Sequence, residues 1–250
     1  MNEASNCGDP GEETAPQVLD GLLTPLPGEL RAELGALATI RDVAAGEALV
    51  REGDRCATVG YVLLGALGME KALPDERLHV IGLLIPHDMF GRLFDGPSSY
   101  DLVALAPSRL IEFDRDEFEE FVARHPEAQA LLLTRILDEL DTAREWLLLM
   151  SGHKVAERVA ALLLVLFRRK ARMPRGAGGE TRPVEVDLPI DRAMLARYLG
   201  TRPESLSRAF HELQRTGAIA LRGPRCIAIR DIRLLVRAAG SDLLLGGEPI

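Results

Sequence analysis

The segment from Pro126 to Met150 most constrains the fold of this chain, because it contains no glycine and no proline beyond its first residue. Its apolar residues recur at alternating spacings of three and four, which is a heptad pattern. They are Leu133, Ile136, Leu140, Ala143, Leu147 and Met150. This seam predicts a long helix that pairs with the same helix of a second chain, although so few heptads would not hold a dimer alone. The alternative is a helix packed on its own domain, for which a broader apolar stripe is typical.

The part before this helix has a different pattern. Short runs rich in Val, Ile and Leu alternate with glycines at positions 46, 53, 65, 82 and 91. Such runs with Gly turns predict an antiparallel β-sandwich or small barrel over residues 18–125, flanked by short helices at about 27–38 and 115–124. Residues 1–17 are polar, with Gly and Pro, and predict a disordered tail.

The part after the helix, residues 152–240, predicts a second domain behind a hinge at 151–153. It opens with a helix over 154–170, followed by a Gly/Pro loop and a short strand. A helix over 191–200 closes at Gly200, and another helix begins three residues later. Two short strands around a Gly-Pro turn then form a hairpin, and 241–250 is a tail. Helix, tight turn, helix and hairpin make a helix-turn-helix with a wing, so the whole chain is expected to be α+β.

Charge separates these two parts. The chain carries a formal net charge of −8, which alone argues against nucleic acid. Residues 152–240, however, contain 18 Lys and Arg against 8 Asp and Glu, a net of +10, whereas the remainder has 12 against 30, a net of −18. This asymmetry favours a basic binding module joined to an acidic domain, with chance clustering of Arg as the alternative.

The stretch TRPESLSRAFHELQRTGAI, residues 201–219, has a polar helical face suited to reading bases. Arg208 matches the O6/N7 edge of guanine, Glu204 can accept from the cytosine amino group, and Ser207 can hydrogen-bond or contact a thymine methyl. The alternatives are local. Thr201 and Glu204 have capping-box spacing, and Arg208 could be a solvated side chain.

Polar residues around that helix are candidates for contacts with DNA phosphates. They are Arg192, Thr201, Arg202, Ser205, Arg215, Arg222 and Arg225, with Arg197 beside them.

No paired acid and base and no activated nucleophile is evident, so we expect no catalytic residues and no enzyme activity.

The motif LARYLGTRPESLSRAFHELQRTGAI resembles the DNA-binding domain of the CRP/FNR superfamily of bacterial transcription regulators. Glu204, Ser207 and Arg208 are similar to the E-x-x-S-R form of the FNR/FixK branch, and Pro203 stands where the CRP branch has Arg. The resemblance implies a cyclic-nucleotide-binding-like β-roll, a dimerisation helix over 126–151 and a winged helix-turn-helix. It also implies a homodimer on inverted repeats resembling TTGAT-N4-ATCAA, control of low-oxygen or nitrogen-oxide metabolism, and, for an activator, contact with RNA polymerase.

The β-roll that this resemblance implies departs from members that bind cyclic AMP. Those members hold the ribose with the Glu of a G-E-L step and the cyclic phosphate with an Arg-Ser or Arg-Thr pair. Here Gly91 and Leu93 fit, but Arg92 replaces the Glu, and Ser99-Tyr100 stands at the Arg-Ser position. Without the charge-assisted partner of the phosphate, we do not expect a cyclic nucleotide to be the effector.

Other cofactors are not evident from the residues. Cys7 and Cys56 are too few and wrongly spaced for the N-terminal iron–sulfur cluster of the FNR branch. Haem stays open, because the chain has histidines at 79, 87, 125 and 153, but no spacing singles one out from ordinary surface histidines. FixK-like branches lack an evident ligand and are controlled by their own synthesis, and the chain fits that pattern. The alternative is a sensor gated by haem, NO or a cyclic nucleotide.

The three cysteines show neither a disulfide framework nor metal-ligand spacing, so no metal site is predicted and reduced thiols are expected. Cys226 lies beside Arg225 and near Arg222, a basic setting that could make the thiol redox-active, with a small buried strand residue as the alternative. The N-terminus lacks a signal-peptide pattern, and no apolar run reaches membrane-spanning length. We therefore expect a cytoplasmic protein.

Overall fold

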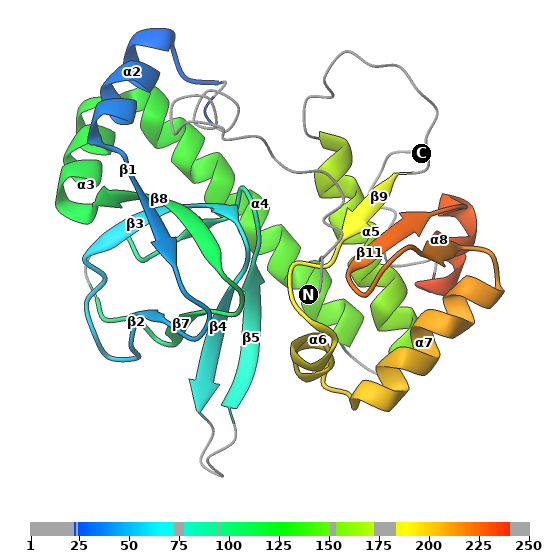
Figure 1. Cartoon of the computed structure of the whole chain (residues 1–250). Coiled ribbons are helices and arrows are strands. Elements are labelled where there is room, and N and C mark those ends of the chain that lie inside the picture. Colours follow the sequence, from blue (N-terminus) through cyan, green and yellow to red (C-terminus); the bar gives the residue numbers. More distant parts are fainter. Residues whose placement is uncertain are drawn as a thin grey trace. The chain divides into compact units, whose positions relative to one another are not determined.

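The computed structural model describes Leu23 and residues 25–72, 78–94, 96–150, 154–172 and 184–240. These residues form two compact units that divide inside helix α4 (Pro126–Met150), between Leu137 and Asp138 (Figure 1). The predicted tails and the hinge at 151–153 lie outside the described residues, as does most of the predicted Gly/Pro loop. Within the described part, no helix is both long and apolar enough to cross a membrane.

The N-terminal unit contains two antiparallel four-stranded sheets, as the alternation of apolar runs and glycines predicts. One has the strand order β1-β8-β3-β6 and the other β2-β7-β4-β5. Their bounds are β1 Thr39–Val43, β2 Ala48–Val50, β3 Thr58–Leu64, β4 Leu67–Ala72, β5 Leu78–Leu84, β6 Met89–Phe90, β7 Asp101–Ala104 and β8 Ser108–Asp114. All described strand pairs in the two sheets are antiparallel, so the predicted fold class is confirmed for this unit.

Most of the predicted glycine turns are present, with one exception. Gly65 joins β3 to β4 with a φ of +86°, and a Cβ there would lie 2.5 Å from the Pro107 carbonyl oxygen, so only glycine fits. Gly82 is not a turn residue. It lies within β5 and pairs with Met69 of β4 at a bulge, where a Cβ would collide with the methionine side chain. An isolated glycine in an apolar run thus marks a bulge here rather than the end of a strand.

Helices cover one sheet of this unit, and their packing forms one of its two apolar cores. Helices α2 (Gly28–Leu37) and α3 (Arg115–Arg124) match the two predicted flanking helices. Together with the start of α4 they pack against β3 and β8, whereas a second core lies between the two sheets. Asp114 caps α3 by accepting hydrogen bonds from the Asp116 and Glu117 amides, which explains why the helix begins at Arg115.

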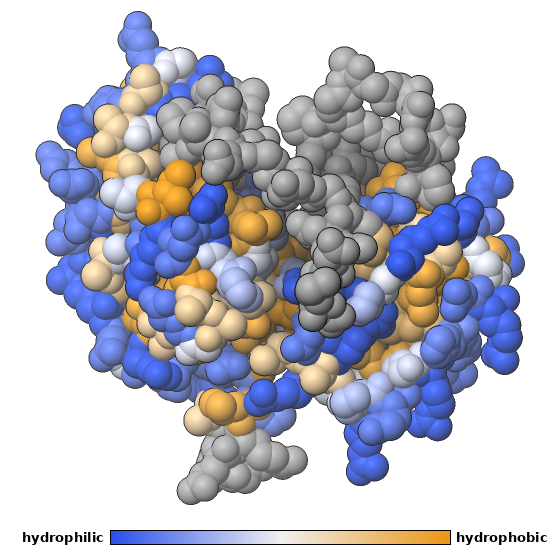
Figure 2. Space-filling model, viewed as in Figure 1, coloured by the Kyte–Doolittle hydropathy of each residue, from blue (hydrophilic) through white to orange (hydrophobic). Residues whose placement is uncertain are grey.

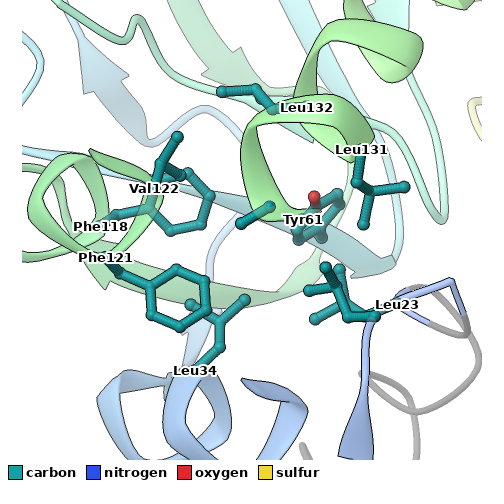
Figure 3. Close-up of a pocket in the computed structure, with 10 residues that line it drawn as sticks. Leu23, Leu34, Tyr61, Phe118, Phe121, Val122, Leu131 and Leu132 are labelled. Atoms are coloured by element: carbon teal, nitrogen blue, oxygen red, sulfur yellow. The ribbon is translucent and has the colours of Figure 1, made fainter. Parts of the chain in front are cut away.

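An apolar pocket lies within the helix-side core (Figure 3). Phe118 and Phe121 from α3, Leu131 and Leu132 from α4, and Leu34 from α2 surround Tyr61 of β3. Its free volume is about 20 Å³, room for roughly one water molecule and far below the size of a cofactor site. Burial raises the pKa of Tyr61, so its hydroxyl stays neutral. This pocket therefore completes the core and does not accommodate a haem or a nucleotide.

Helix α4 spans the segment that the heptad pattern predicts, and it leaves apolar side chains in solvent. Leu133 is 59% exposed, Ile136 47% and Leu140 43%, and Ala143 is also exposed. Leu137, which the strict heptad does not include, is 52% exposed beside them. The side chains of Leu147 and Met150 lie outside the described set. The described part of the seam is thus unburied in a single chain, as a surface that awaits a second helix would be.

The C-terminal unit consists of a small sheet and the helices that pack beside it (Figure 1). Its elements are α5 Val155–Arg172, β9 Glu185–Asp187, α6 Arg192–Tyr198, α7 Pro203–Arg215, β10 Ile219–Leu221, β11 Cys226–Ile229 and α8 Ile232–Ala238. The predicted hairpin is β10 and β11, and β9 joins it to give an antiparallel sheet in the order β10-β11-β9. The pairing of β9 and the final helix α8 were not predicted.

Candidate nucleic-acid interface

The turn between α6 and α7 is built from local capping signals. Asp191 caps α6 by accepting from the Met194 amide. At the other end Gly200 has a φ of +59°, its amide donates to the Arg197 carbonyl, and the Thr201 amide donates to the Ala196 carbonyl. This pair of bonds is a Schellman motif, which ends a helix sharply and requires the left-handed conformation that glycine adopts freely. The predicted end at Gly200 is confirmed, and the chain turns at once into α7.

Helix α7 has two distinct faces. Leu206, Ala209, Phe210 and Leu213 are buried against the unit. Glu204, Ser207 and Arg208 are exposed on the opposite side, as the helical spacing predicts. In Figure 2 the surface over α6 and α7 is mostly hydrophilic. The apolar face thus anchors the helix and leaves the polar face available to a partner.

The capping-box interpretation of Glu204 is wrong. Helix α7 has Arg202, not Thr201, at its N-cap, and no side chain caps its first amides. Pro203 occupies the first helical position, where its missing N–H costs nothing and its fixed φ suits the helix. Among the described residues, the Glu204 carboxylate has neither a hydrogen bond nor an ion pair. The carboxylate is therefore not engaged by its own helix end.

The side chain of Arg208 is held by its own helix. Its Nη2 donates to the Ser205 hydroxyl oxygen at 3.1 Å, one turn earlier. Ser205 is half-buried, while Arg208 and Ser207 are exposed. The guanidinium has four other N–H donors, because a guanidinium carries five in a planar fork. Ser205 thus lies where it orients Arg208 along the exposed face.

Four of the surrounding arginines are exposed and unpaired within the described residues. They are Arg197, Arg202, Arg215 and Arg222. These residues come from α6, the α6–α7 turn, the end of α7 and the wing turn, residues 222–225 between β10 and β11. Thr201 is half-buried in the turn. These unpaired guanidinium groups give the unit a positively charged surface, which attracts the phosphates of nucleic acid.

Two other predicted phosphate ligands are already engaged. The Arg192 guanidinium lies over the Phe210 ring, 3.4 Å from its centroid, and Nε donates to the Pro224 carbonyl at 3.0 Å. Arg225 donates from Nε to the Leu188 carbonyl at 2.9 Å and from Nη2 to the Pro189 carbonyl at 2.7 Å. Residue type and charge placed these two arginines with the others, but their hydrogen bonds set them apart.

Cys226 is 4% exposed and begins β11. The neighbouring Arg225 directs its guanidinium to main-chain carbonyl oxygens of the segment before α6. Cys226 is disulfide-bonded in this structure, so the expectation of a reduced thiol is wrong at this position, whereas a redox role of Cys226 stays a prediction. Cys56 is a buried free cysteine, and Cys7 lies outside the described residues.

The segment that the resemblance aligns with a nucleotide site contains a glycine with positive φ but lacks the expected Glu and Arg. Gly91 has a φ of +91°, and a Cβ there would lie 2.7 Å from the Thr58 carbonyl oxygen. Arg92 is exposed and has no hydrogen bond or ion pair among the described residues. Ser99 is exposed, and its carbonyl accepts from Lys71 Nζ at 2.8 Å, while the same Nζ pairs with Glu52 at 2.8 Å. No arginine occupies the position at which the phosphate would be held.

The described histidines are spread over the N-terminal unit, apart from His211 of α7. His79 is in β5, His87 precedes β6, and His125 joins α3 to α4, where Nε2 lies 3.2 Å from Glu33 and the ring packs on Phe121. The described residues contain no group of three or more His, Cys, Asp or Glu side chains that could hold a metal ion. His153 is not among them.

Two family models match the two units. Residues 157–238 match the Crp-like helix-turn-helix domain, and residues 40–125 match the cyclic nucleotide-binding domain. The first match contains most of α5 and all of α6 to α8, and the second contains most of the two sheets and α3.

Curated proteins and a solved structure are similar over most of the chain. The transcriptional activator protein FnrL of Cereibacter sphaeroides is 36% identical over 88% of this chain and 87% of its own length. The nitrogen fixation regulation protein FixK of Bradyrhizobium diazoefficiens is 31% identical over 70% of this chain and 72% of its own. The solved structure of FixK2 from Bradyrhizobium japonicum superimposes with a TM-score of 0.68 at 28% identity, covering 80% of this chain and 96% of that one.

Proposed function

Because the chain belongs to the FNR/FixK branch of the CRP/FNR family of transcription regulators, we propose that it is a homodimeric activator that binds an inverted repeat of DNA. The half-sites resemble TTGAT and ATCAA, separated by four base pairs. The observation that supports this proposal most directly is the exposed face of α7. Glu204, Ser207 and Arg208 lie on this face, and the apolar side of the helix is buried.

Each of these three side chains has a role in base recognition. Arg208 donates two hydrogen bonds to a guanine, Glu204 accepts from a cytosine amino group, and Ser207 contacts the adjacent base. All three lie in the first two turns of α7, the part of a recognition helix that enters the major groove. The absence of a capping bond to Glu204 supports this assignment, because its carboxylate has no competing partner in the described structure.

Backbone contacts and symmetry complete the interface. Arg202, Arg215 and Arg222 neutralise phosphates around the groove, with Thr201 and Ser205 at the start of α7 as polar neighbours. Dimerisation through the exposed stripe on α4 presents two copies of α7 to half-sites about one helical turn apart. The arrangement explains why an inverted repeat is the expected target.

Selection of bound sequences from random duplexes tests this proposal. Purified protein should enrich an inverted repeat with TTGAT-like half-sites at a single spacing. A band shift with the enriched duplex should show one complex that contains two chains. Enrichment of a single half-site, or no preference at physiological ionic strength, would contradict the proposal.

Activation requires contact with RNA polymerase, through exposed loops of the β-roll or the wing side of the C-terminal unit. The names of FnrL and FixK, a transcriptional activator and a regulator of nitrogen fixation, support activation and control of low-oxygen or nitrogen-oxide metabolism. Transcription in vitro with purified RNA polymerase, on a promoter that carries the selected repeat, should rise when the protein is added. Unchanged or reduced transcription would contradict activation.

We also propose that DNA binding needs no small-molecule effector. Ser99 stands where the phosphate-binding Arg is expected, and the nearby Lys71 is held by Glu52 and a main-chain carbonyl. The match of residues 40–125 to a cyclic nucleotide-binding domain favours the alternative, a regulator gated by a cyclic nucleotide or by haem. Band shifts separate the two. Ligand-free protein should bind the selected repeat, whereas binding only after addition of cyclic AMP or haem would establish the gated alternative.

A further inference from the structure

Two arginines connect the wing turn to the start of α6 in a reciprocal manner. Arg225, at the end of the wing turn 222–225, donates to the carbonyls of Leu188 and Pro189, just before α6. Arg192, the first residue of α6, donates back to the Pro224 carbonyl in the wing turn. The Leu188 amide also donates to the Arg225 carbonyl at 2.7 Å. The wing turn and the segment before α6 are therefore joined by hydrogen bonds in both directions.

Arg192 also contacts the recognition helix. Its guanidinium stacks on Phe210, which is 1% exposed and belongs to the buried face of α7. Burial lowers the pKa of Arg192 to about 10, so the group is partly withdrawn from water but still charged at neutral pH. The Arg192 side chain thus contacts α7 through the face of its guanidinium and the wing turn through Nε.

These contacts differ from those of the neighbouring Arg222. Arg222 lies in the same wing turn and has no side-chain partner among the described residues. A phosphate ligand needs donors that are free to face the backbone of the duplex, as those of Arg222 are. Arg192 and Arg225 instead direct donors to carbonyl oxygens of their own unit.

We propose that Arg192 and Arg225 are positioning residues, which fix the wing turn relative to α7 so that Arg222 reaches a phosphate while α7 reads the bases. The inference rests on the proposed DNA-binding function and assigns these two arginines a role other than the predicted phosphate contact. It requires the planar guanidinium rather than a positive charge, because an ammonium group cannot both stack on Phe210 and donate from a fixed fork.

Charge-conserving variants test the inference. Arg192→Lys should weaken binding to the selected repeat on the order of tenfold, because a positioned charge-assisted hydrogen bond is removed. Its slope of log affinity against log salt should match that of wild type, because the number of neutralised phosphates does not change. The matched control, Arg222→Ala, should reduce that slope by about 0.9 for each phosphate that is no longer neutralised. Arg225→Lys should behave as Arg192→Lys does.

A double-mutant cycle and an exchange measurement separate positioning from general stability. If the wing is misplaced in Arg192→Lys, adding Arg222→Ala should cost less than it does in wild type. Amide hydrogen exchange of residues 222–226 in the free protein should become faster in Arg192→Lys, while the melting temperature shows that the unit is folded.

Several results would overturn the inference. Wild-type affinity and wild-type exchange in Arg192→Lys, with a reduced salt slope in Arg192→Ala, would make Arg192 a phosphate ligand. Strict additivity with Arg222→Ala would also contradict positioning. A wild-type protein without preference among duplexes would instead contradict the proposed function, and the exchange of the wing turn would still test the contacts.

Discussion

Among single residues, Arg208 allows the most specific prediction, because the Ser205 hydroxyl accepts a hydrogen bond from its guanidinium at the exposed face of α7. We predict that Arg208→Ala costs about 1–3 kcal/mol of binding free energy on the selected repeat and relaxes discrimination at one guanine. Ser205→Ala should weaken binding less, because it removes only the hydrogen bond that orients the guanidinium. Competition band shifts with duplexes altered at each position measure both. An equal loss on every sequence would show that Arg208 contacts a phosphate.

Asp101 makes a pH-dependent contribution to stability in the β-roll. It accepts from the Glu52 amide at 2.6 Å and pairs with Arg51 at 3.0 Å, and these contacts hold its pKa below the ordinary range. A carboxyl group whose pKa is lowered by folding stabilises the fold at pH values above its unfolded pKa of about 3.9, and this contribution disappears as the pH falls through the folded pKa.

Asp101→Asn should therefore lower the free energy of unfolding by about 1 kcal/mol at pH 7, and by less at a pH below the unfolded pKa of about 3.9. Urea unfolding at the two pH values measures the change. Asp54→Asn is the matched control, because Asp54 is exposed in the same region and has no side-chain partner in the described structure. A cost for Asp101→Asn that does not vary with pH would contradict the electrostatic explanation.

At this scale the sequence predicts which residues lie on a face better than which of them are engaged. Helical spacing placed Glu204, Ser207 and Arg208 together on the exposed face of α7, and they lie there. The engagement of Arg192 and Arg225 was not predicted, because their acceptors lie 32 to 37 residues away in sequence and are brought near only by the fold. Pro203 did carry a usable signal against the capping box, since proline favours the first helical position.

Among the elements, α4 has the clearest consequence. Leu133, Ile136, Leu137 and Leu140 are all substantially exposed, although each has the apolar area that normally belongs in a core. Leu133→Asp should leave each chain folded but weaken the dimer at least about tenfold, because burying a leucine contributes about 1.5–3 kcal/mol. Sedimentation measures the dissociation of the dimer, and band shifts measure the loss of DNA binding that follows from it. Thr134→Asp, one residue away and off the stripe, is the control, and equal effects of the two variants would contradict the seam.

The same helix predicts the orientation of the pair. With Leu133 at heptad position a, Glu139 takes position g and Arg144 position e, and both are exposed. In a parallel pair, position g of one helix faces the position e that follows it on the other helix, so Glu139 would meet Arg144 of the second chain. Glu139→Arg and Arg144→Glu should each weaken the dimer, and the double variant should restore it. Lack of restoration would contradict the parallel register.

Elements with strong local signals were predicted from the sequence, and the others were not. Helices α2, α3 and α4 begin and end within a residue or two of their predicted bounds, because capping residues, glycines and prolines mark their ends. The pairing of β9 with β11 depends on contacts between distant segments, which periodicity does not encode. Helix α8 had an overlooked signal, since Asp231 accepts from the Arg233 and Leu234 amides as an N-cap.

For the whole molecule, the central prediction concerns ligands. A ligand that binds only the folded state, at about one hundred times its dissociation constant, stabilises it by about 2.7 kcal/mol. Millimolar cyclic AMP should not raise the melting temperature, because the phosphate-binding Arg is replaced by Ser99, whereas the selected duplex should raise it. Thermal unfolding with each addition measures both, and stabilisation by cyclic AMP would refute an effector-free regulator.

The division between the two compact units inside α4 restricts how chimeras of this protein could be made. Leu133 and Ile136 fall on one side of that division, and Leu140 falls on the other. A junction at Leu137–Asp138 would join half a seam from one parent to half from another, with mismatched side chains at its centre. A chimera that joins this helix-turn-helix unit to the sensor domain of another protein should therefore take the whole of α4 from a single parent.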